Sequence, residues 1–543
     1  MVFARRSTTL LAAIIASCAM VLSLTACTSD NKTVVDGQTT VTSNSAGGVA
    51  VFTPSDGITL NQQTPLNKWA KLVPDLAKAL ADAGFKKGDI DHTTSDSLAK
   101  QSRAIQDFVV DHLSNNTTDD SGIAIAPDNM TLLVAPVVEA DASTRQYGDY
   151  ISQNLSTNDA TDGEATSDGE SSEDDSSKDD SSSTESDSTA SDEQAQAVDR
   201  LVSSLKLAKE SGMHVVLLGN SIEGYKPDAF VKFSDAQTIG KLQAEKMVSK
   251  LKLDKASKDN PKYIEVLLPY TAVDEKGNAN DSTFAQEAFR GIWQVLGSYY
   301  QKGVVESPSG TLDGKSTEND WQAVAYDAAK EGSTAKVLDK RLAKTDGQST
   351  LTRIDGIITM NDYIASEVVK ELDDLGYTGS AADINPQITI SGIVGNITGK
   401  KDLSRDAVPD PIKSPENDNA NDSSSSDDDA DEDTSASDKD RDSQWPLVTG
   451  YGAYVSNIPS IVNGKQWMTG MEDRQTIATD IAQACAKLNK DEALNSMPSI
   501  RNSEVGGVKK IPTISEPLLA VSASNLKSAL IDPGYISLAD AGL

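Results

Sequence analysis

Short apolar runs alternate with amphipathic segments along most of this 543-residue chain, and this alternation constrains the fold more than any other feature. The runs at 130–136, 214–218, 263–268 and 356–360 are mostly apolar and lack a two-residue alternation of apolar and polar residues. Strands that are buried on both faces of a parallel sheet have this pattern. The sequence therefore predicts an α/β fold in which helices cover both faces of parallel sheets.

Helices are predicted between these runs. In the first of them, Trp69–Ala83, Leu72, Leu76 and Leu80 recur at helical spacing, and Gly84 follows where a helix C-cap belongs. Further helices are predicted at 102–113, 197–211, 239–251, 282–296, 321–331, 362–375 and 473–488, and weaker strands at 58–60, 387–392 and 447–450. Two strand–helix series in succession indicate two lobes. Since open parallel sheets bind ligands beyond the carboxyl ends of their strands, we expect a ligand cleft between the lobes.

The net charge of −33 comes mainly from two tracts. Residues 156–193 contribute −13 and residues 414–442 contribute −10, which leaves −10 for the remainder. Neither tract contains a large aliphatic or aromatic residue, so neither can bury enough apolar surface to fold, and both are predicted to be disordered inserts. The spacing of acidic residues in a calcium-binding loop is absent from them. The chain also has no basic patch, which excludes nucleic acid as a partner.

The N-terminus contains Arg5 and Arg6, an apolar run at 10–22, and the sequence Leu24–Thr25–Ala26–Cys27. This end resembles a bacterial lipobox. The resemblance implies a signal peptide at 1–26 and a diacylated Cys27 that anchors the chain to the extracytoplasmic face of the cell membrane. An ordinary secretory signal with a chance cysteine is the alternative. Residues 27–55 are rich in Ser, Thr and Gly and are predicted to be a flexible tether. Because only Cys485 remains elsewhere in the mature chain, no disulfide, metal site or cofactor is expected.

Several stretches, taken in order, carry a resemblance to a known family. They are Phe233–Ala236 with Ile239–Ala244, Asp320–Trp321, Ile354–Asp362, Val448–Ala453, Asn463–Thr469, and Glu516–Leu519 with Asn525 and Gly534–Tyr535. Together they are similar to type I periplasmic solute-binding proteins, specifically to the xylose and multi-sugar branch of ABC importer components. Outside the inserts, the resemblance covers most of residues 56–543.

The resemblance implies two lobes joined by three hinge crossings, near 233–235, 451–453 and 514–517. The N-terminal lobe would comprise 56–233 with 453–513, and the C-terminal lobe 234–452 with 514–543. Such a protein closes on a sugar-like solute and presents it to an ABC permease. The resemblance also implies a monomer. It implies no enzymatic activity, because binding requires no stabilised transition state.

The resemblance also implies a set of ligand-binding residues: Trp69, Asn220, Ser221, Ser234, Asp235, Asn280, Trp321, Asn361 and Tyr451. The Asn361 amide can donate to and accept from a sugar hydroxyl, and Trp321 can stack on a sugar ring. Other roles remain open. The tryptophans can pack in the core, and Asp235, Asn280 and Asn361 can cap helices.

The chain also departs from the family pattern. Asn220 and Ser221 stand where the family has an Asp-Arg pair, Gly452 stands where it has an aspartate, and Glu472 lies near the position of a lysine. Loss of these charge-assisted hydrogen bonds argues against xylose itself as the ligand. Two functions therefore stay open. One is a solute-binding lipoprotein for a carbohydrate, and the other is a cell-surface sensor or interaction lipoprotein with a degenerate cleft. No serine-hydrolase elbow or HExxH motif supports a secreted hydrolase.

Overall fold

A computed structural model describes residues 32–35, 38–41, 46–55, 65–115, 125–138, 144–157, 184–273, 280–343, 351–382 and 445–543. The chain divides into two compact units, 1–45 and 46–543. In the first unit, β1 (Lys32–Val35) and β2 (Gln38–Val41) form an antiparallel pair with Lys32 opposite Val41. All further elements belong to the second unit.

The larger sheet of the second unit has seven strands in the order β17-β18-β9-β7-β5-β3-β4. These strands are β3 (Gly48–Pro54), β4 (Ile90–Ser95), β5 (Met130–Val134), β7 (His214–Leu218), β9 (Ala229–Val231), β17 (Ile500–Val505) and β18 (Val508–Ile514). All neighbours pair in parallel except β17 and β18. Because β3 lies between β4 and β5, the strand order reverses between β3 and β5, as it does in doubly wound sheets.

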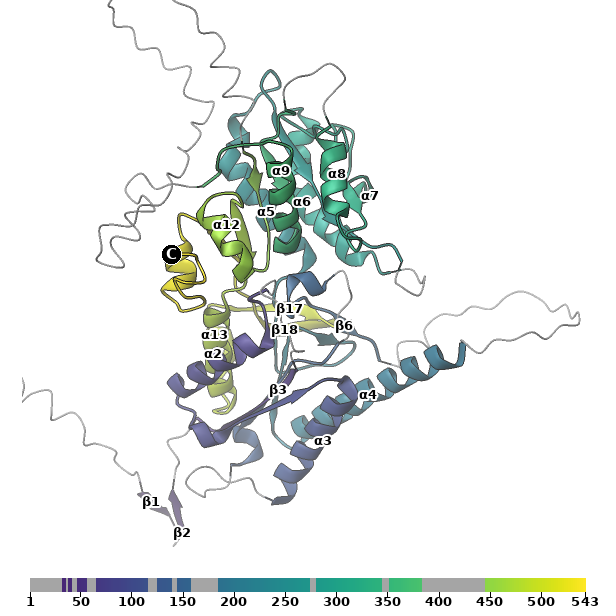
Figure 1. Ribbon diagram of the computed structural model, residues 1–543. Helices are drawn as coiled ribbons and strands as arrows, with labels where there is room; N and C mark the ends of the chain where they lie inside the picture. Colours follow the sequence, from purple (N-terminus) through teal and green to yellow (C-terminus); the bar gives the residue numbers. More distant parts are fainter. Residues whose placement is uncertain are drawn as a thin grey trace, which may run out of the picture. The chain divides into compact units, whose positions relative to one another are not determined.

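Successive residues of β3 face opposite cores, which explains why the strand is apolar throughout. Val49 and Val51 pack in a cluster with α2 (Trp69–Asp82) and α13 (Arg474–Leu488). Ala50 and Phe52 pack in a second cluster with α3 (Leu98–Asn115) and α4 (Thr184–Glu210). Helices therefore cover both faces of the sheet (Figure 1).

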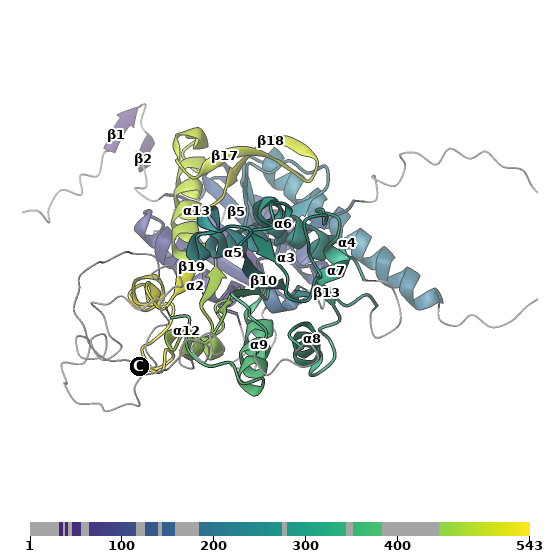
Figure 2. The ribbon, with the colours of Figure 1, turned by 90° about the horizontal axis from the view of Figure 1, so that it is seen from above.

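The smaller sheet has four parallel strands in the order β12-β10-β14-β15. They are β10 (Lys262–Val266), β12 (Val305–Glu306), β14 (Gly356–Ile358) and β15 (Leu447–Val448). One core contains the helices α5 (Ala236–Leu251) and α6 (Thr283–Gln301), which run side by side (Figure 2). The other core contains α8 (Ser333–Arg341) and α9 (Asp362–Asp374). Gly291 permits the close approach of α5 and α6, since a Cβ there would lie 2.0 Å from the Gln237 carbonyl oxygen.

Short elements complete the second unit. They include the pairs β6 (Asn154–Leu155) with β8 (Ser221–Ile222), β11 (Leu268–Pro269) with β13 (Ala325–Tyr326), and β16 (Met468–Met471) with β19 (Leu519–Ser522), and the helices α7 (Trp321–Val324) and α12 (Ile458–Val462). Among the described residues, the chain passes three times between the elements built on the two sheets. The first passage follows β9, the second lies between β15 and α13, and the third follows β18.

The predicted α/β class is confirmed, with parallel sheets flanked by helices. The predicted strands at 130–136 and 214–218 correspond to β5 and β7. The predicted helix at 362–375 is α9. Cys485 is buried in the core, as a small apolar residue would be. None of the described helices combines the length and apolarity needed to cross a membrane.

Three predictions were wrong in part. The predicted tether at 27–55 includes β3, whose residues Val49–Phe52 are buried in the centre of the larger sheet. The predicted helix at 321–331 ends at Val324, because Ala325 and Tyr326 pair with β11. The acidic tract at 156–193 is helical from Thr184, where α4 begins, because the helix propagates outward from its packed C-terminal half.

Several predictions lie outside the described residues. These are the lipidated Cys27, the strands at 58–60 and 387–392, and the acidic tract at 414–442.

Candidate functional site

One segment of the chain reaches the carboxyl ends of strands in both parallel sheets. Residues 144–155, here called the 144–155 segment, lie between β5 and α4 and include β6. The Asn361 Nδ2, just beyond β14, donates to the Gln146 Oε1 at 3.0 Å. The Gln153 backbone N–H donates to the Asn220 Oδ1, just beyond β7, at 3.0 Å. Because ligands of open parallel sheets bind at these strand ends, the segment marks the candidate site.

Asn361 has two roles at once. Its Oδ1 accepts from the Ile364 backbone N–H at 2.9 Å and caps α9, while its Nδ2 points to Gln146. The side chain is fully buried. It follows Met360, whose φ of 67° is uncommon for a residue with a side chain and marks a local strain. The helix-cap alternative for Asn361 is therefore confirmed, and the remaining amide group is directed to the segment.

Tyr147 fills the space beside Asn361. Its ring lies 4.6 Å from the Phe284 ring and 6.2 Å from the Tyr451 ring, measured between centroids. The side chain is buried in the core of the smaller sheet, and this burial raises the pKa of its hydroxyl. The Tyr454 hydroxyl donates to the Gln146 carbonyl oxygen at 2.7 Å, which holds the same turn from another direction.

Tyr150 joins the segment to the core of the larger sheet. Its ring stacks on Phe233 at 4.7 Å and meets Trp69 edge-on at 5.1 Å. Trp69 also packs edge-on against Phe233 at 5.7 Å and is buried. The Asp149 carboxylate accepts from the Trp69 backbone N–H at 3.1 Å and pairs with Lys68 Nζ at 2.6 Å. Trp69 thus packs among the chain's own aromatic rings, as its core-packing alternative predicts.

Asn220 and Ser221 are likewise engaged by the chain itself. The Asn220 Nδ2 donates to the Pro136 carbonyl oxygen at 2.9 Å, so both ends of its buried amide are paired. The Ser221 hydroxyl donates to the Asn154 Oδ1 at 2.8 Å, and its backbone N–H donates to the Gln153 carbonyl oxygen at 2.9 Å. Both residues help to hold the 144–155 segment.

A buried carboxyl group lies where two of the chain passages meet. The Ser234 backbone N–H donates to the Glu472 Oε1 at 2.6 Å, and the Ser234 hydroxyl also donates to it. The Tyr451 hydroxyl shares a 2.5 Å hydrogen bond with Ser234. Burial raises the pKa of Glu472 to about 7, although the hydrogen bonds from Ser234 oppose this shift. Sequence reasoning did not include Glu472 in the site, although its position after the buried strand β16 was a usable signal.

Asp235 follows Ser234 in the sequence, but its side chain caps the helix α5. Its carboxylate accepts from the Thr238 backbone N–H at 2.7 Å and caps α5. It also pairs with Lys232 at 2.9 Å. The hydrogen bonds from Thr238 and the Lys232 charge outweigh the effect of burial and lower its pKa. The cap alternative for Asp235 is therefore confirmed.

Trp321 and Asn280 both contact Tyr270, in a group separate from the contacts described above. The Trp321 ring meets the Tyr270 ring edge-on at 5.1 Å, and the Tyr270 hydroxyl donates to the Asn280 carbonyl oxygen at 3.1 Å. The Asn280 Nδ2 donates to the Thr271 carbonyl oxygen at 2.8 Å. Asn280 therefore fixes a loop and does not cap α6, whose N-cap residue is Ser282.

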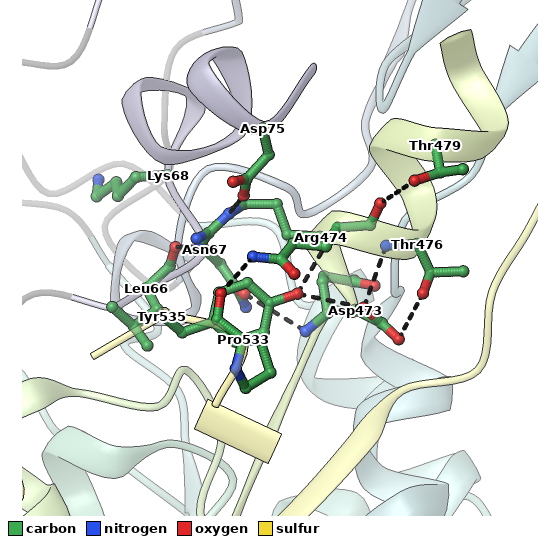
Figure 3. Close-up of polar contacts among 12 residues, drawn as sticks. Leu66, Asn67, Lys68, Asp75, Asp473, Arg474, Thr476, Thr479, Pro533 and Tyr535 are labelled. Carbon is green, nitrogen blue, oxygen red and sulfur yellow. Dashed lines mark hydrogen bonds and ion pairs between the residues drawn. The ribbon is translucent and has the colours of Figure 1, made fainter. Parts of the chain in front are cut away.

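The start of α13 is fixed by a polar network next to Glu472 (Figure 3). The Arg474 Nε donates to Asp75 at 2.5 Å, and the Arg474 guanidinium lies 4.5 Å from the Tyr535 ring centroid. The Tyr535 hydroxyl donates to the Asp473 carboxylate at 3.2 Å, and Asp473 caps α13 through the Thr476 backbone N–H. This network begins one residue after Glu472, which accepts from Ser234.

The described part of the site offers amides, hydroxyls, aromatic rings and carboxyl groups. These groups suit the hydrogen bonds and ring faces of a polyhydroxylated solute. Among the residues that the structure describes, no cluster of His, Cys, Asp and Glu could hold a metal ion. In this structure most of the predicted ligand-binding side chains contact the 144–155 segment or one another.

No protein-family model matches the chain, and no curated protein matches it. Solved structures do. An ABC transporter solute-binding protein from Clostridium phytofermentans with bound β-D-glucose is 17% identical, covers 91% of this chain and 99% of its own, and has a TM-score of 0.43. A carbohydrate transporter solute-binding protein from Chloroflexus aurantiacus in complex with D-glucose is 18% identical, with coverage of 92% and 98% and a TM-score of 0.42. A periplasmic ribose ABC transporter protein from Conexibacter woesei is 13% identical, with coverage of 90% and 96% and a TM-score of 0.42. The chain is thus similar, over most of its length, to binding proteins of ABC transporters.

Proposed function

We propose that this chain is a lipid-anchored, extracytoplasmic solute-binding protein that holds a carbohydrate between two α/β lobes for an ABC importer. One lobe would be built on the seven-stranded sheet, from residues 46–233 with 453–513. The other would be built on the four-stranded sheet, from residues 234–452 with 514–543. The revised start at 46 includes β3.

One observation carries the proposal. Asn220 follows β7 of the larger sheet and Asn361 follows β14 of the smaller sheet, and both side chains contact the same 144–155 segment. A small molecule at this place would touch the carboxyl ends of strands in both sheets at once. Parallel sheets bind ligands at these ends, and a ligand held by two bodies favours their closure.

The three chain passages would act as the hinges of this closure. A solute held there undergoes no reaction, so the site needs only donors, acceptors and apolar rings in fixed positions. Asn361 would bind a hydroxyl through its amide. The anchor at Cys27 would keep the protein near its permease and raise its effective concentration there.

A second function is favoured by a separate observation. The polar atoms of Asn220 are both paired within the chain, and Trp69 is enclosed by aromatic rings of the same lobe. A chain with these pairings would also suit a cell-surface sensor or interaction lipoprotein that has kept the fold and lost solute transport.

Thermal unfolding in the presence of D-glucose, D-xylose or L-arabinose tests the first function against the second. A sugar at about one hundred times its Kd stabilises the folded state by about 2.7 kcal/mol, which a melting curve detects. We expect Asn361→Ala to remove this response and the exposed control Asn260→Ala to keep it. If no sugar raises the melting temperature of the natural chain, the carbohydrate proposal is contradicted.

A further inference from the structure

The 144–155 segment makes the contacts that a bound solute would make. Gln146 presents an amide oxygen to the Asn361 Nδ2 at 3.0 Å, and Tyr147 places a planar ring between Phe284 and Tyr451. A sugar offers comparable features, a hydroxyl oxygen and an apolar C–H face of its ring. A solute therefore cannot reach Asn361 while Gln146 and Tyr147 hold these positions.

The turn of the segment at Gly148 packs closely against the backbone of Asn67. Gly148 has a φ of +98°, and a Cβ at this position would lie 2.5 Å from the Asn67 carbonyl oxygen. The next residue, Asp149, donates its backbone N–H to the same carbonyl at 2.8 Å and pairs with Lys68. The turn thus sits against Asn67 so closely that only glycine fits.

The polar contacts that hold the segment are individually modest. The bonds to Asn361 and Asn220 join neutral groups, and β6 pairs with β8 over two residues. The Lys68–Asp149 pair is partly exposed, with 17% and 19% of the two side chains accessible. Neutral hydrogen bonds each contribute little to stability, so a solute that makes equivalent bonds can replace the polar contacts, while its own apolar contacts must offset the burial of Tyr147 and Tyr150.

We propose that the 144–155 segment is an intramolecular occupant of the solute site, which holds both lobes together without solute and must leave before a carbohydrate binds. This inference rests on the proposed function and adds a gate to it. The apparent Kd for a sugar then equals the intrinsic Kd divided by the fraction of molecules with an empty site.

The test uses the full chain, hydrogen–deuterium exchange of the 144–155 segment, and calorimetric titration with D-glucose, D-xylose and L-arabinose. In Gly148→Ala the new methyl group would displace the turn from Asn67. We therefore expect faster exchange in the segment and an apparent Kd that is lower by about tenfold or more. Gly376→Ala is the matched control. Gly376 has a similar φ of +90°, but a Cβ there meets nothing within 4 Å, so neither quantity should change.

A second, milder variant tests the inference if Gly148→Ala does not fold. Gln146→Ala removes one side-chain hydrogen bond, which corresponds to about a fivefold lower apparent Kd. In the natural chain, a saturating sugar should displace the segment and speed its exchange. If the sugar binds while the segment becomes more protected, or if faster exchange in both variants leaves the Kd unchanged, the inference is overturned and the proposed function stands. If no sugar binds the natural chain, the proposed function fails and the inference falls with it.

Discussion

Replacement of Glu472 by glutamine should stabilise the protein at alkaline pH. The carboxyl group is fully buried between Ser234 and Tyr451, and burial raises its pKa from 4.5 to about 7. The folded protein therefore holds this proton more tightly than the unfolded chain does. Below about pH 4.5 both states are protonated and the residue has no pH-dependent effect on the free energy of unfolding.

Between about pH 4.5 and pH 7 the unfolded chain loses the proton while the folded protein keeps it, so the free energy of unfolding falls as the pH rises. The pKa difference corresponds to a loss of about 3 kcal/mol, complete above pH 7. In Glu472→Gln the amide oxygen can still accept from the Ser234 N–H, and no proton is lost. The variant should thus match the natural protein near pH 4 and exceed its stability by about 3 kcal/mol near pH 8.

Urea unfolding, followed by tryptophan fluorescence across this pH range, measures the difference between variant and natural protein. This difference isolates Glu472 from Asp362, whose pKa is also raised by burial, to about 6. The exposed control Glu504→Gln should shift neither the midpoint nor its pH dependence. If Glu472→Gln is destabilising by the same amount at every pH, the carboxyl group is ionised in the folded protein and the reasoning is refuted.

Three further predictions address the helix contact, the anchor and the aromatic core. Gly291→Ala should lower the free energy of unfolding by about 1–3 kcal/mol in urea, because the new methyl group would overlap the Gln237 carbonyl oxygen; an unchanged midpoint would show that α5 and α6 separate freely. Cys27→Ser should move the chain from the membrane to the soluble fraction on immunoblots, and continued membrane association would contradict the lipid anchor. Phe233→Ala should cost about 3–5 kcal/mol in the same urea assay, because the rings of Trp69 and Tyr150 both pack against Phe233, whereas a cost below about 1 kcal/mol would show that this core is loosely packed.

The sequence predicted strands well where a single strand contributes to two cores. The run at 214–218 is apolar on both faces because β7 lies inside the larger sheet, and the pattern is unambiguous. The same signal was present at Val49–Phe52, but the surrounding Ser, Thr and Gly residues led to its assignment as tether. Composition averaged over a window thus concealed a strand that its own residues indicate.

The error at 321–331 has a different cause. Helical spacing continues past Val324, but Ala325 and Tyr326 pair in parallel with Leu268 and Pro269. The pairing partner lies more than fifty residues away, so tertiary contact overrides the local preference. No local reading of the sequence contains this information.

The local roles of some residues near the candidate site were predictable from the sequence, but their arrangement in space was not. The cap roles of Asp235 and Asn361 follow from residue type and position before a helix, and both caps are present. The partner of the Asn361 amide is Gln146, which is 215 residues distant in the chain. The 144–155 segment has no apolar periodicity and no motif, so its placement depends on long-range contacts, above all the packing of Tyr147 and Tyr150 in two separate cores.

The neutral side chains of Asn220 and Ser221 help to explain why the 144–155 segment could occupy the proposed solute site. A charged pair at these positions would bind a sugar hydroxyl through bonds about twice as strong as neutral ones. With Asn220 and Ser221, a solute would make bonds of the same kind as the 144–155 segment does, and the segment has the added advantages of covalent attachment and of two buried rings, Tyr147 and Tyr150. The equilibrium between bound segment and bound solute then depends on how closely the turn at Gly148 packs against Asn67. A single methyl group at Gly148 should therefore shift the apparent affinity for a solute.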